Sequence, residues 1–268
     1  MDVMIDNERV ASGGAASRGP YRPERAGALI IGDCYQALGI VRSLGRQGIP
    51  VWVIGNGHVV AAVSRYVRRT LAWPAGDTAR QVGYLLDLAV RHHLDGWTIY
   101  PTTDEHAALL ARHHAVLAER FLLATPPWGM LRWAYDKRHT YRIAADLGID
   151  HPRTYYPDTR SAVAELDPAF PLILKPAFKE RANRFTLAKA WRVEDRGALL
   201  ARYDDACTLV SPDVIMLQEV IPGGGEEQYS FAALCAEGRP LAWMVVRRAP
   251  VSAGVRAGQY ICRDGRPP

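Results

Sequence analysis

Two short stretches decide how the chain is organised: PLILKPA at residues 171–177 and VIMLQEVIPGGGEE at residues 214–227. In the first, three apolar residues predict a buried strand that ends in Lys175, with Pro176 directly behind it. Burying a lysine at the end of an apolar strand is costly unless its ammonium group meets an anion. The second stretch predicts another strand, and the sequence between the two leaves room for one strand and one helix. Lys175 is therefore the first candidate for a binding residue.

The second stretch places polar groups where its strand ends. The residues that follow the apolar run are Gln218, Glu219, Val220 and Ile221, and after the glycines come Glu226 and Glu227. This order suits a nucleotide, with a phosphate on Lys175, the adenine edge along the backbone near 219–221, and the ribose on one acid. Glu227 is the better ribose candidate, although the sequence does not separate it from Glu226. The triple glycine predicts a flexible turn, because no lysine or helix start follows it.

A third element lies upstream, in YDKRHTYRIAADLGIDHPRTY at residues 135–155, which contains Asp136 and Lys137. Taken together and in this order, the three elements resemble the ATP-grasp superfamily, and within it the carboxylate–amine ligase-like branch. The resemblance covers roughly residues 27–249. It implies an α/β protein in which a Rossmann-like pre-ATP-grasp domain precedes an α+β ATP-grasp domain.

The organisation along the chain agrees with this expectation. Residues 1–26 are rich in Gly, Ala, Ser, Arg and Pro and predict a disordered segment. Residues 27–125 are expected to form the Rossmann-like domain and residues 126–249 the ATP-grasp domain. The remaining residues, 250–268, show no strand or helix periodicity and predict an irregular tail.

In the first domain, apolar runs alternate with segments of helical periodicity, which predicts a parallel, doubly wound sheet. The expected strands are 28–31, 51–54, 66–71, 98–100 and 121–123. Thr102 and Glu105 have the spacing of a capping box at the start of a helix. Residues 102–104 also follow a strand, where open α/β sheets bind ligands, so they are candidates to contact an acceptor substrate.

The second domain is expected to begin with one helix over residues 128–147, stopped by Gly148. The further expected helices are 159–166 and 194–203, and the expected strands are 153–156, 172–175, 185–193, 214–220, 228–235 and 241–247. The last two strands are joined by Glu237-Gly238-Arg239-Pro240, which predicts a hairpin.

The resemblance implies a function and a set of site residues. An ATP-grasp ligase of this branch phosphorylates a small carboxylate with ATP, and an amine then attacks the acyl-phosphate to give an amide, ADP and phosphate. Lys137 and Lys175 would contact the nucleotide phosphates, and the backbone of 218–221 would contact adenine. The alternative for Lys175 is a solvent-facing residue at the rim of a sheet, and for Lys137 it is surface charge on a helix.

The family also implies Mg²⁺, held by an acid and a later Glu-x-Asn pair that follow the hairpin. Beyond Arg248 the chain contains one acid, Asp264, and no asparagine. The ATP-grasp domain is therefore expected to be incomplete, and no metal ligand is assigned. The alternative function is a non-catalytic nucleotide-binding protein or the remnant of a truncated gene. The loop 178–184 lacks the glycines whose backbone amides often approach phosphates in this family. Its basic residues either replace those contacts with positive charge or form a solvated basic loop.

Composition disfavours several other classes. The net charge of +5 comes from 33 basic and 28 acidic residues that are scattered along the chain, which argues against nucleic-acid binding. The first domain lacks the G-x-G-x-x-G pattern of dinucleotide-binding proteins. Four cysteines without ligand spacing, no long apolar span and no signal-peptide pattern predict a cytoplasmic protein without membrane contact. The expected partners are small-molecule carboxylates and amines, and whether the chain forms a homodimer is left open.

Overall fold

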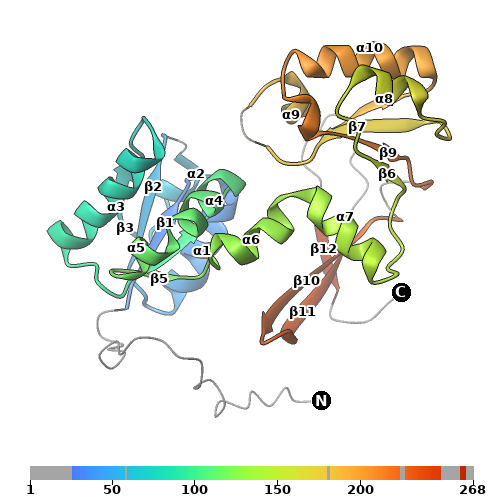
Figure 1. Ribbon diagram of the computed structural model, residues 1–268. Coiled ribbons are helices and arrows are strands. Elements are labelled where there is room, and N and C mark those ends of the chain that lie inside the picture. Colours follow the sequence, from blue (N-terminus) through green and yellow to red (C-terminus); the bar gives the residue numbers. More distant parts are fainter. Residues whose placement is uncertain (1–25, 58, 180–181, 224–226, 249–259, 264–268) are drawn as a thin grey trace. The chain divides into compact units, whose positions relative to one another are not determined.

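The computed structural model describes residues 26–57, 59–179, 182–223, 227–248 and 260–263. The chain divides into two compact units, Met1–His151 with Pro176–Lys189, and Pro152–Lys175 with Ala190–Pro268 (Figure 1). The predicted disordered segment lies outside the described residues apart from residue 26. Residues 126–151 group with the first unit, whereas the predicted domain boundary follows residue 125; the predicted boundaries stay predictions.

The first unit is built around a five-stranded sheet with the strand order β3-β2-β1-β4-β5. Its strands are β1 Ala28–Ile31, β2 Val51–Gly55, β3 Val67–Ala72, β4 Thr98–Pro101 and β5 Leu122–Leu123. All four strand pairs are parallel. The chain runs outward from β1 in one direction and then returns to β4 on the other side, which confirms the predicted doubly wound sheet.

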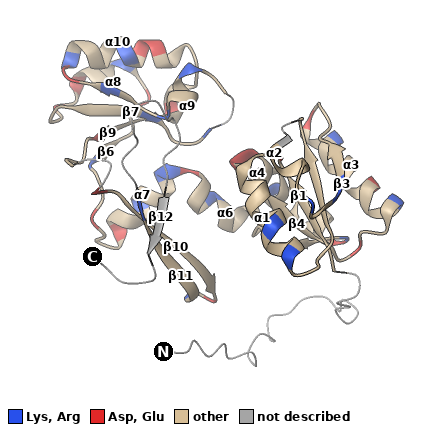
Figure 2. Ribbon diagram, turned by 180° about the vertical axis from the view of Figure 1, so that it is seen from behind, with Lys and Arg blue, Asp and Glu red and all other residues tan. Residues whose placement is uncertain are grey.

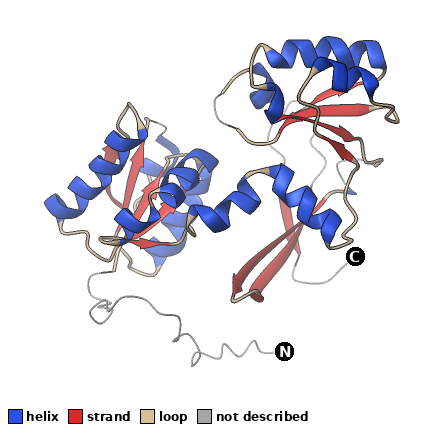
Figure 3. Cartoon of the chain, viewed as in Figure 1, coloured by secondary structure: helices blue, strands red, loops and turns tan. Residues whose placement is uncertain are grey.

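Helices cover both faces of this sheet (Figure 3). The helices of the unit are α1 Tyr35–Arg46, α2 Val59–Ala62, α3 Thr78–His92, α4 Asp104–Arg112, α5 His114–Ala118, α6 Trp128–Tyr135, α7 Lys137–Asp146 and α9 Arg184–Ala188. Successive side chains of a strand point to opposite faces. Leu29 and Ile31 of β1 accordingly pack with α3, α4 and α5, while Ala28 and Ile30 pack with α1 and α2.

The prediction of a single helix over residues 128–147 is wrong, because the structure has two helices there. Asp136 separates α6 from α7 with an extended backbone (φ −97°, ψ 110°), and its side chain accepts a hydrogen bond from the Arg138 amide at 2.9 Å. A residue that caps a new helix in this way satisfies backbone donors that would otherwise lack partners. Asp136, which the resemblance singles out together with Lys137, is therefore the residue that caps the start of α7.

Two further predictions are corrected. The strand expected over 185–193 is instead the short helix α9 followed by a shorter strand, because Asn183 and Thr186 form a reciprocal capping box that starts a helix. The cap of α4 is Thr103, whose hydroxyl accepts from the His106 amide at 3.2 Å. Thr102 instead donates its hydroxyl hydrogen to the Ile31 carbonyl at 2.9 Å, which links β4 to β1.

The second unit contains a four-stranded sheet with the order β6-β9-β7-β8. Its strands are β6 Thr154–Tyr155, β7 Leu172–Pro176, β8 Trp191–Val193 and β9 Ile215–Glu219. The pairs β6–β9 and β7–β8 are antiparallel. Helices α8 Arg160–Glu165 and α10 Arg196–Cys207 lie together on one face, and the short 3₁₀ helix Pro212–Val214 leads into β9 (Figure 1).

The same unit contains a three-stranded antiparallel sheet formed by β10 Tyr229–Ala236, β11 Arg239–Arg248 and β12 Tyr260–Arg263. The predicted hairpin of β10 and β11 is confirmed, with a bulge between Leu234 and Cys235. The tail was expected to be irregular, yet residues 260–263 pair with β11. Tyr and Ile favour strands, and β11 offers an edge to pair with, which explains the difference. Residues 250–259 and 264–268 of the tail lie outside the described residues.

Candidate functional site

The predicted lysine of the second unit lies on β7, next to β9 in the sheet. Leu172 and Leu174 are buried, and the alternation along the strand places Ile173 and Lys175 on the opposite face. The Lys175 ammonium donates a hydrogen bond to Gln218 Oε1 at 2.6 Å. The structure therefore brings together two of the predicted site residues, which are 43 residues apart in the sequence.

Gln218 connects this lysine to a third strand. Its side-chain amide donates to Thr154 Oγ1 at 2.8 Å, and the Thr154 hydroxyl donates to the Pro152 carbonyl at 2.7 Å. Gln218 is only 3% exposed. Buried polar groups of this kind remain only where their hydrogen bonds are made. Lys175, Gln218 and Thr154 thus form one chain of hydrogen bonds across β7, β9 and β6.

The backbone predicted to read adenine follows directly after Gln218. The Glu219 amide donates to the Arg153 carbonyl at 3.0 Å, and the Val220 amide donates to the Pro171 carbonyl at 3.4 Å. Ile221 is 65% exposed. Because two of the three amides already have partners, adenine recognition here would depend on the Ile221 amide and on carbonyl groups, and the assignment stays a prediction.

Of the two ribose candidates, Glu226 lies outside the described residues and Glu227 is exposed. Glu227 folds back toward the start of the turn, because a Cβ on Gly223 would come within 2.2 Å of its Oε2. Gly223 also has a φ of +114°, which residues with a side chain rarely adopt. A residue with a side chain would therefore be strained at position 223 and would clash with Glu227.

The other predicted lysine is the first residue of α7 in the first unit. Its side-chain ammonium and its backbone amide both donate to the Ala177 carbonyl, each at 3.1 Å. Lys137 is exposed, and α7 contains no buried residue. Lys137 is thus tied to the segment that follows β7, whereas Lys175 belongs to the other unit.

Asp136 is the buried acid beside Lys137. Its carboxylate receives hydrogen bonds from Arg138 Nε at 3.0 Å and Arg138 Nη2 at 2.6 Å. Burial by itself would raise the pKa of Asp136, but the side-chain and backbone hydrogen bonds of Arg138 outweigh it and hold the pKa below its usual value. The Arg138 guanidinium also lies 5.4 Å from the centre of the Phe178 ring. Asp136 and Arg138 therefore form a charged pair that anchors the start of α7.

The loop after β7 makes one described ion pair of its own. Lys179 Nζ lies 3.6 Å from Glu105 Oε1, and both side chains are close to half exposed. Of the remaining basic residues there, Arg181 lies outside the described residues and Arg184 opens α9. The two alternatives for this loop, compensation for missing glycines or a solvated basic surface, both stay open.

The lysines of the chain are few and lie close together in the sequence. Only four of its 33 basic residues are lysines, and all four lie between Lys137 and Lys189. Basic residues are otherwise spread over the elements of both units (Figure 2). An ammonium is a compact donor with three hydrogens, unlike the planar guanidinium, so the two residues differ in how they bind phosphate.

The described residues include no group of three or more His, Cys, Asp or Glu side chains that could hold a metal ion, and no ligand is assigned to the Mg²⁺ that the resemblance implies. The described helices also include none with the length and apolar character of a membrane span.

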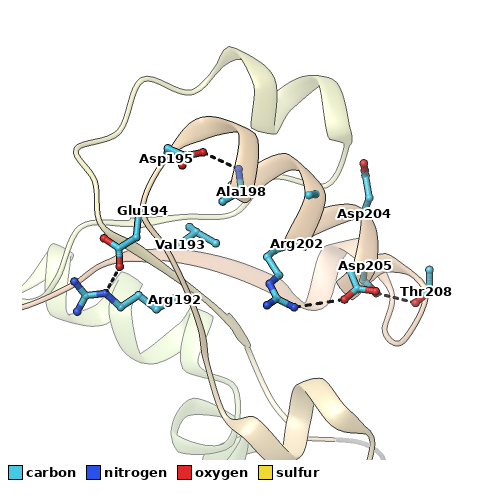
Figure 4. Close-up of a pocket in the computed structure, with 10 residues that line it drawn as sticks. Arg192, Val193, Glu194, Asp195, Ala198, Arg202, Asp204, Asp205 and Thr208 are labelled. Atoms are coloured by element: carbon cyan, nitrogen blue, oxygen red, sulfur yellow. Dashed lines mark hydrogen bonds and ion pairs between the residues drawn. The ribbon is translucent and has the colours of Figure 1, made fainter.

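Described residues line an open cavity in each unit. The larger, of about 730 Å³, lies along α10 and β8 and is lined by Arg192, Val193, Glu194, Asp195, Ala198, Ala201, Arg202, Asp204, Asp205 and Thr208. Figure 4 shows that its charged side chains pair with one another, as Arg192 does with Glu194 at 2.7 Å and Arg202 with Asp205 at 3.8 Å. It contains none of the predicted site residues.

The cavity of the first unit, about 600 Å³, lies beyond the carboxyl ends of β2, β3 and β4. Its lining includes Asn56, Trp73, Gln81, Thr103, Glu105 and His106. Burial lowers the pKa of His106, an effect that Glu105, a hydrogen bond with the Ile31 backbone and Asp33 partly offset. Of the predicted residues 102–104, Thr103 lines this cavity, which agrees with the rule for open sheets.

Sequence reasoning missed two parts of this arrangement. Thr154 was expected only as a strand residue, and the carbonyl of Ala177 was not considered as an acceptor. The partner of Thr154 follows from strand register, because Thr154 lies opposite Gln218 in the β6–β9 pair. Register between strands 64 residues apart cannot be read from local pattern, so no sequence signal marked this threonine.

Comparisons with known proteins agree with the fold. The sequence matches no protein-family model and no curated protein. Among solved structures it is similar to an L-amino acid ligase from Bacillus licheniformis, with a TM-score of 0.62 and 17% identity over 90% of this chain and 55% of that one. It is also similar to N5-carboxyaminoimidazole ribonucleotide synthetase from Thermus thermophilus, with a TM-score of 0.58 and 15% identity over 84% of this chain and 55% of that one.

A third similar structure is the biotin carboxylase domain dimer of the 2-oxoglutarate carboxylase from Hydrogenobacter thermophilus, in complex with MgADP, ADP and bicarbonate. Here the TM-score is 0.52 and the identity 14%, over 76% of this chain and 45% of that one. At such identities the likeness concerns the fold. The chain has the fold of these structures, in agreement with the ATP-grasp fold that the resemblance implies, and it spans about half the length of the structures that it matches.

Proposed function

We propose that this chain binds ATP, with Lys175 as the principal contact to the phosphates. The observation that carries the proposal is the ammonium of Lys175, held at 2.6 Å by the buried Gln218 on the neighbouring strand. A lysine fixed on a sheet presents its donor hydrogens in defined directions, which suits an anion with several oxygens. The exposed backbone at Ile221 and the carboxylate of Glu227 would then contact adenine and ribose.

The reaction that we propose for the complete site is ligation of a small carboxylate to an amine. The carboxylate oxygen attacks the γ-phosphorus of ATP, ADP leaves, and the acyl-phosphate forms. The amine nitrogen then attacks the acyl carbon, phosphate leaves with the C–O electrons, and the nitrogen loses a proton. Lys175 and Lys137 would each neutralise phosphate charge in such a transfer. Mg²⁺ supplies further charge neutralisation in ligases of this fold, but the described residues of this chain offer no ligand set for it.

The binding proposal is tested by calorimetric titration of ATP into the wild type and Lys175→Met at constant salt. We expect the variant to lose about 1.5–3 kcal/mol of binding free energy, the range for hydrogen bonds to charged groups. Lys189→Met is the matched control, because Lys189 is another of the four lysines and is exposed. Equal affinities of wild type and Lys175→Met would remove Lys175 from the site.

A second candidate function is nucleotide binding without catalysis, the alternative that the sequence leaves open. It predicts that ATP binds while ADP is not released. The test is ADP release with Mg²⁺ over a panel of carboxylates and amines. Turnover that depends on both substrates would exclude the non-catalytic function, and its absence despite tight ATP binding would support it.

A further inference from the structure

The hydrogen bonds that hold Lys175 have only one consistent direction. The carbonyl of Pro152 can only accept, so the Thr154 hydroxyl must donate to it. The Thr154 oxygen therefore accepts from the amide nitrogen of Gln218, and this turns the amide oxygen toward Lys175. The oxygen and nitrogen of a glutamine amide are told apart by their hydrogen-bond partners. For Gln218, the Pro152 carbonyl fixes which is which, because it sets the direction of the Thr154 hydroxyl.

The acceptor that reaches Lys175 is an uncharged amide oxygen, where an isosteric carboxylate would fit the same space. A glutamate at position 218 would place a negative charge about 2.6 Å from the ammonium. Such a pair would hold the lysine by its charge, but the carboxylate would lack the hydrogen that the Gln218 amide donates to Thr154. It would also repel a phosphate and compete with it for the ammonium. Gln218 orients the lysine and adds no negative charge to the site.

We infer that Gln218 and Thr154 are positioning residues whose role is to hold the Lys175 ammonium for a polyanionic ligand without adding negative charge. The inference rests on the proposed function, in which Lys175 contacts the phosphates of ATP. It assigns the Gln218 side chain a role, whereas its backbone alone was expected to matter. It also assigns a role to Thr154, which contacts the lysine only through Gln218.

The first arm of the test measures Lys175 itself, without nucleotide. Because the chain contains four lysines, side-chain NMR of protein labelled at lysine Cε and Nζ gives few signals, and the one missing in Lys175→Met is Lys175. We expect Gln218→Glu, Gln218→Met and Thr154→Val each to shift the Lys175 signal. Thr154→Ser, which keeps the hydroxyl, should leave the signal in place.

The second arm measures ATP affinity of the same variants, with thermal unfolding to show that each is folded. Gln218→Glu is expected to weaken ATP binding about tenfold or more, because its carboxylate competes with the phosphates for the Lys175 ammonium. Thr154→Val should weaken ATP binding by a smaller factor. Thr154→Ser, which keeps the hydroxyl, should bind ATP like the wild type. Gln47→Glu, at an exposed glutamine after α1, controls for the added charge alone.

The outcomes separate the inference from the function on which it rests. If Lys175→Met weakens ATP binding and Gln218→Glu does not, the positioning role is wrong and the proposed function stands. If Lys175→Met binds ATP like the wild type, the proposed function fails, while the NMR arm still reports whether Gln218 and Thr154 hold the lysine. An unchanged Lys175 signal in all variants would overturn the inference outright.

Discussion

The two lysines that the sequence marks as phosphate contacts lie in very different surroundings. Lys175 lies one residue before the end of β7, a strand whose core-facing leucines are fully buried, and a buried side chain accepts its hydrogen bond. Lys137 begins a helix with no buried residue, and a backbone carbonyl accepts from it. The same residue type is thus held by packing and register in one region, and by a helix cap and one carbonyl in the other.

This difference shows which part of each arrangement should respond to change. The position of Lys175 depends on the β7 core and on the β6-β9-β7 order, so it should be rigid and sensitive to core substitutions. The position of Lys137 depends on Asp136, which caps α7, and on the contact with Ala177. The Lys137 side chain should therefore be easier to displace, and its removal should cost less free energy of unfolding.

The largest expected effect is on stability in the Lys175 region. Leu174→Ala removes a side chain that is 0% exposed and should cost about 2–5 kcal/mol of unfolding free energy. Ile143→Ala on α7, where the residue is 36% exposed, should cost well under half of that. Urea unfolding of both variants measures the contrast. Equal costs would mean that the two regions are packed alike.

Nucleotide choice should give the next largest effect. If the Ile221 amide and nearby carbonyls read the adenine edge, ATP should bind more tightly than GTP by about 1–3 kcal/mol, the cost of a buried polar group without a partner. Guanine presents a carbonyl where adenine presents an amino group. Calorimetry with both nucleotides at one salt concentration measures the difference. Indistinguishable affinities would contradict the adenine assignment at 219–221.

The sequence predicted most of the first unit, because its apolar runs and helical periodicity are local signals. The strands at 28–31 and 51–54 and their parallel arrangement follow from such runs. Lys175 was found for the same reason, since a charged residue at the end of an apolar strand stands out locally. These features need no knowledge of distant partners.

What the sequence did not predict depends on helix caps that were overlooked and on pairing between distant strands. The break at Asp136 was missed because an acid within a helical pattern does not by itself end a helix. The strand expected at 185–193 gave way to α9, because the Asn183–Thr186 capping box starts a helix there. Thr154 and the strand at 260–263 acquire their roles only through pairing with distant strands.

Asp136 offers a smaller effect with a pH signature. Asp136→Ala removes a helix cap and the partner of Arg138 and should cost about 0.5–2 kcal/mol at pH 7. Because the folded pKa of Asp136 is lowered, its stabilising contribution is complete above the usual aspartate pKa of about 3.9 and is lost as the pH falls through the lower folded value.

The measurement for Asp136 is urea unfolding of the wild type, Asp136→Ala and Asp136→Asn at pH 7 and near pH 3. The difference between wild type and Asp136→Asn should shrink at the lower pH, because the Asp136 carboxyl of the unfolded chain takes up a proton there and that of the folded chain resists it. Asp87, whose side chain is largely exposed on α3, serves as the control position. A difference that stays constant with pH would show that the charge of Asp136 does not matter for stability.

The smallest expected effect belongs to Lys137. Lys137→Met removes an exposed ammonium whose described acceptor is a neutral carbonyl, so stability should change by no more than about 1 kcal/mol.

If Lys137 contacts phosphate, ATP affinity should still fall, though less than in Lys175→Met, because an exposed ammonium is solvated and screened by salt. Titrations at low and high salt separate the two lysines: the loss in Lys137→Met should fade with added salt, and the loss in Lys175→Met should persist. A Lys137→Met variant that loses as much as Lys175→Met at every salt concentration would mean that both lysines are held equally firmly, and the contrast between the two regions would then not extend to binding.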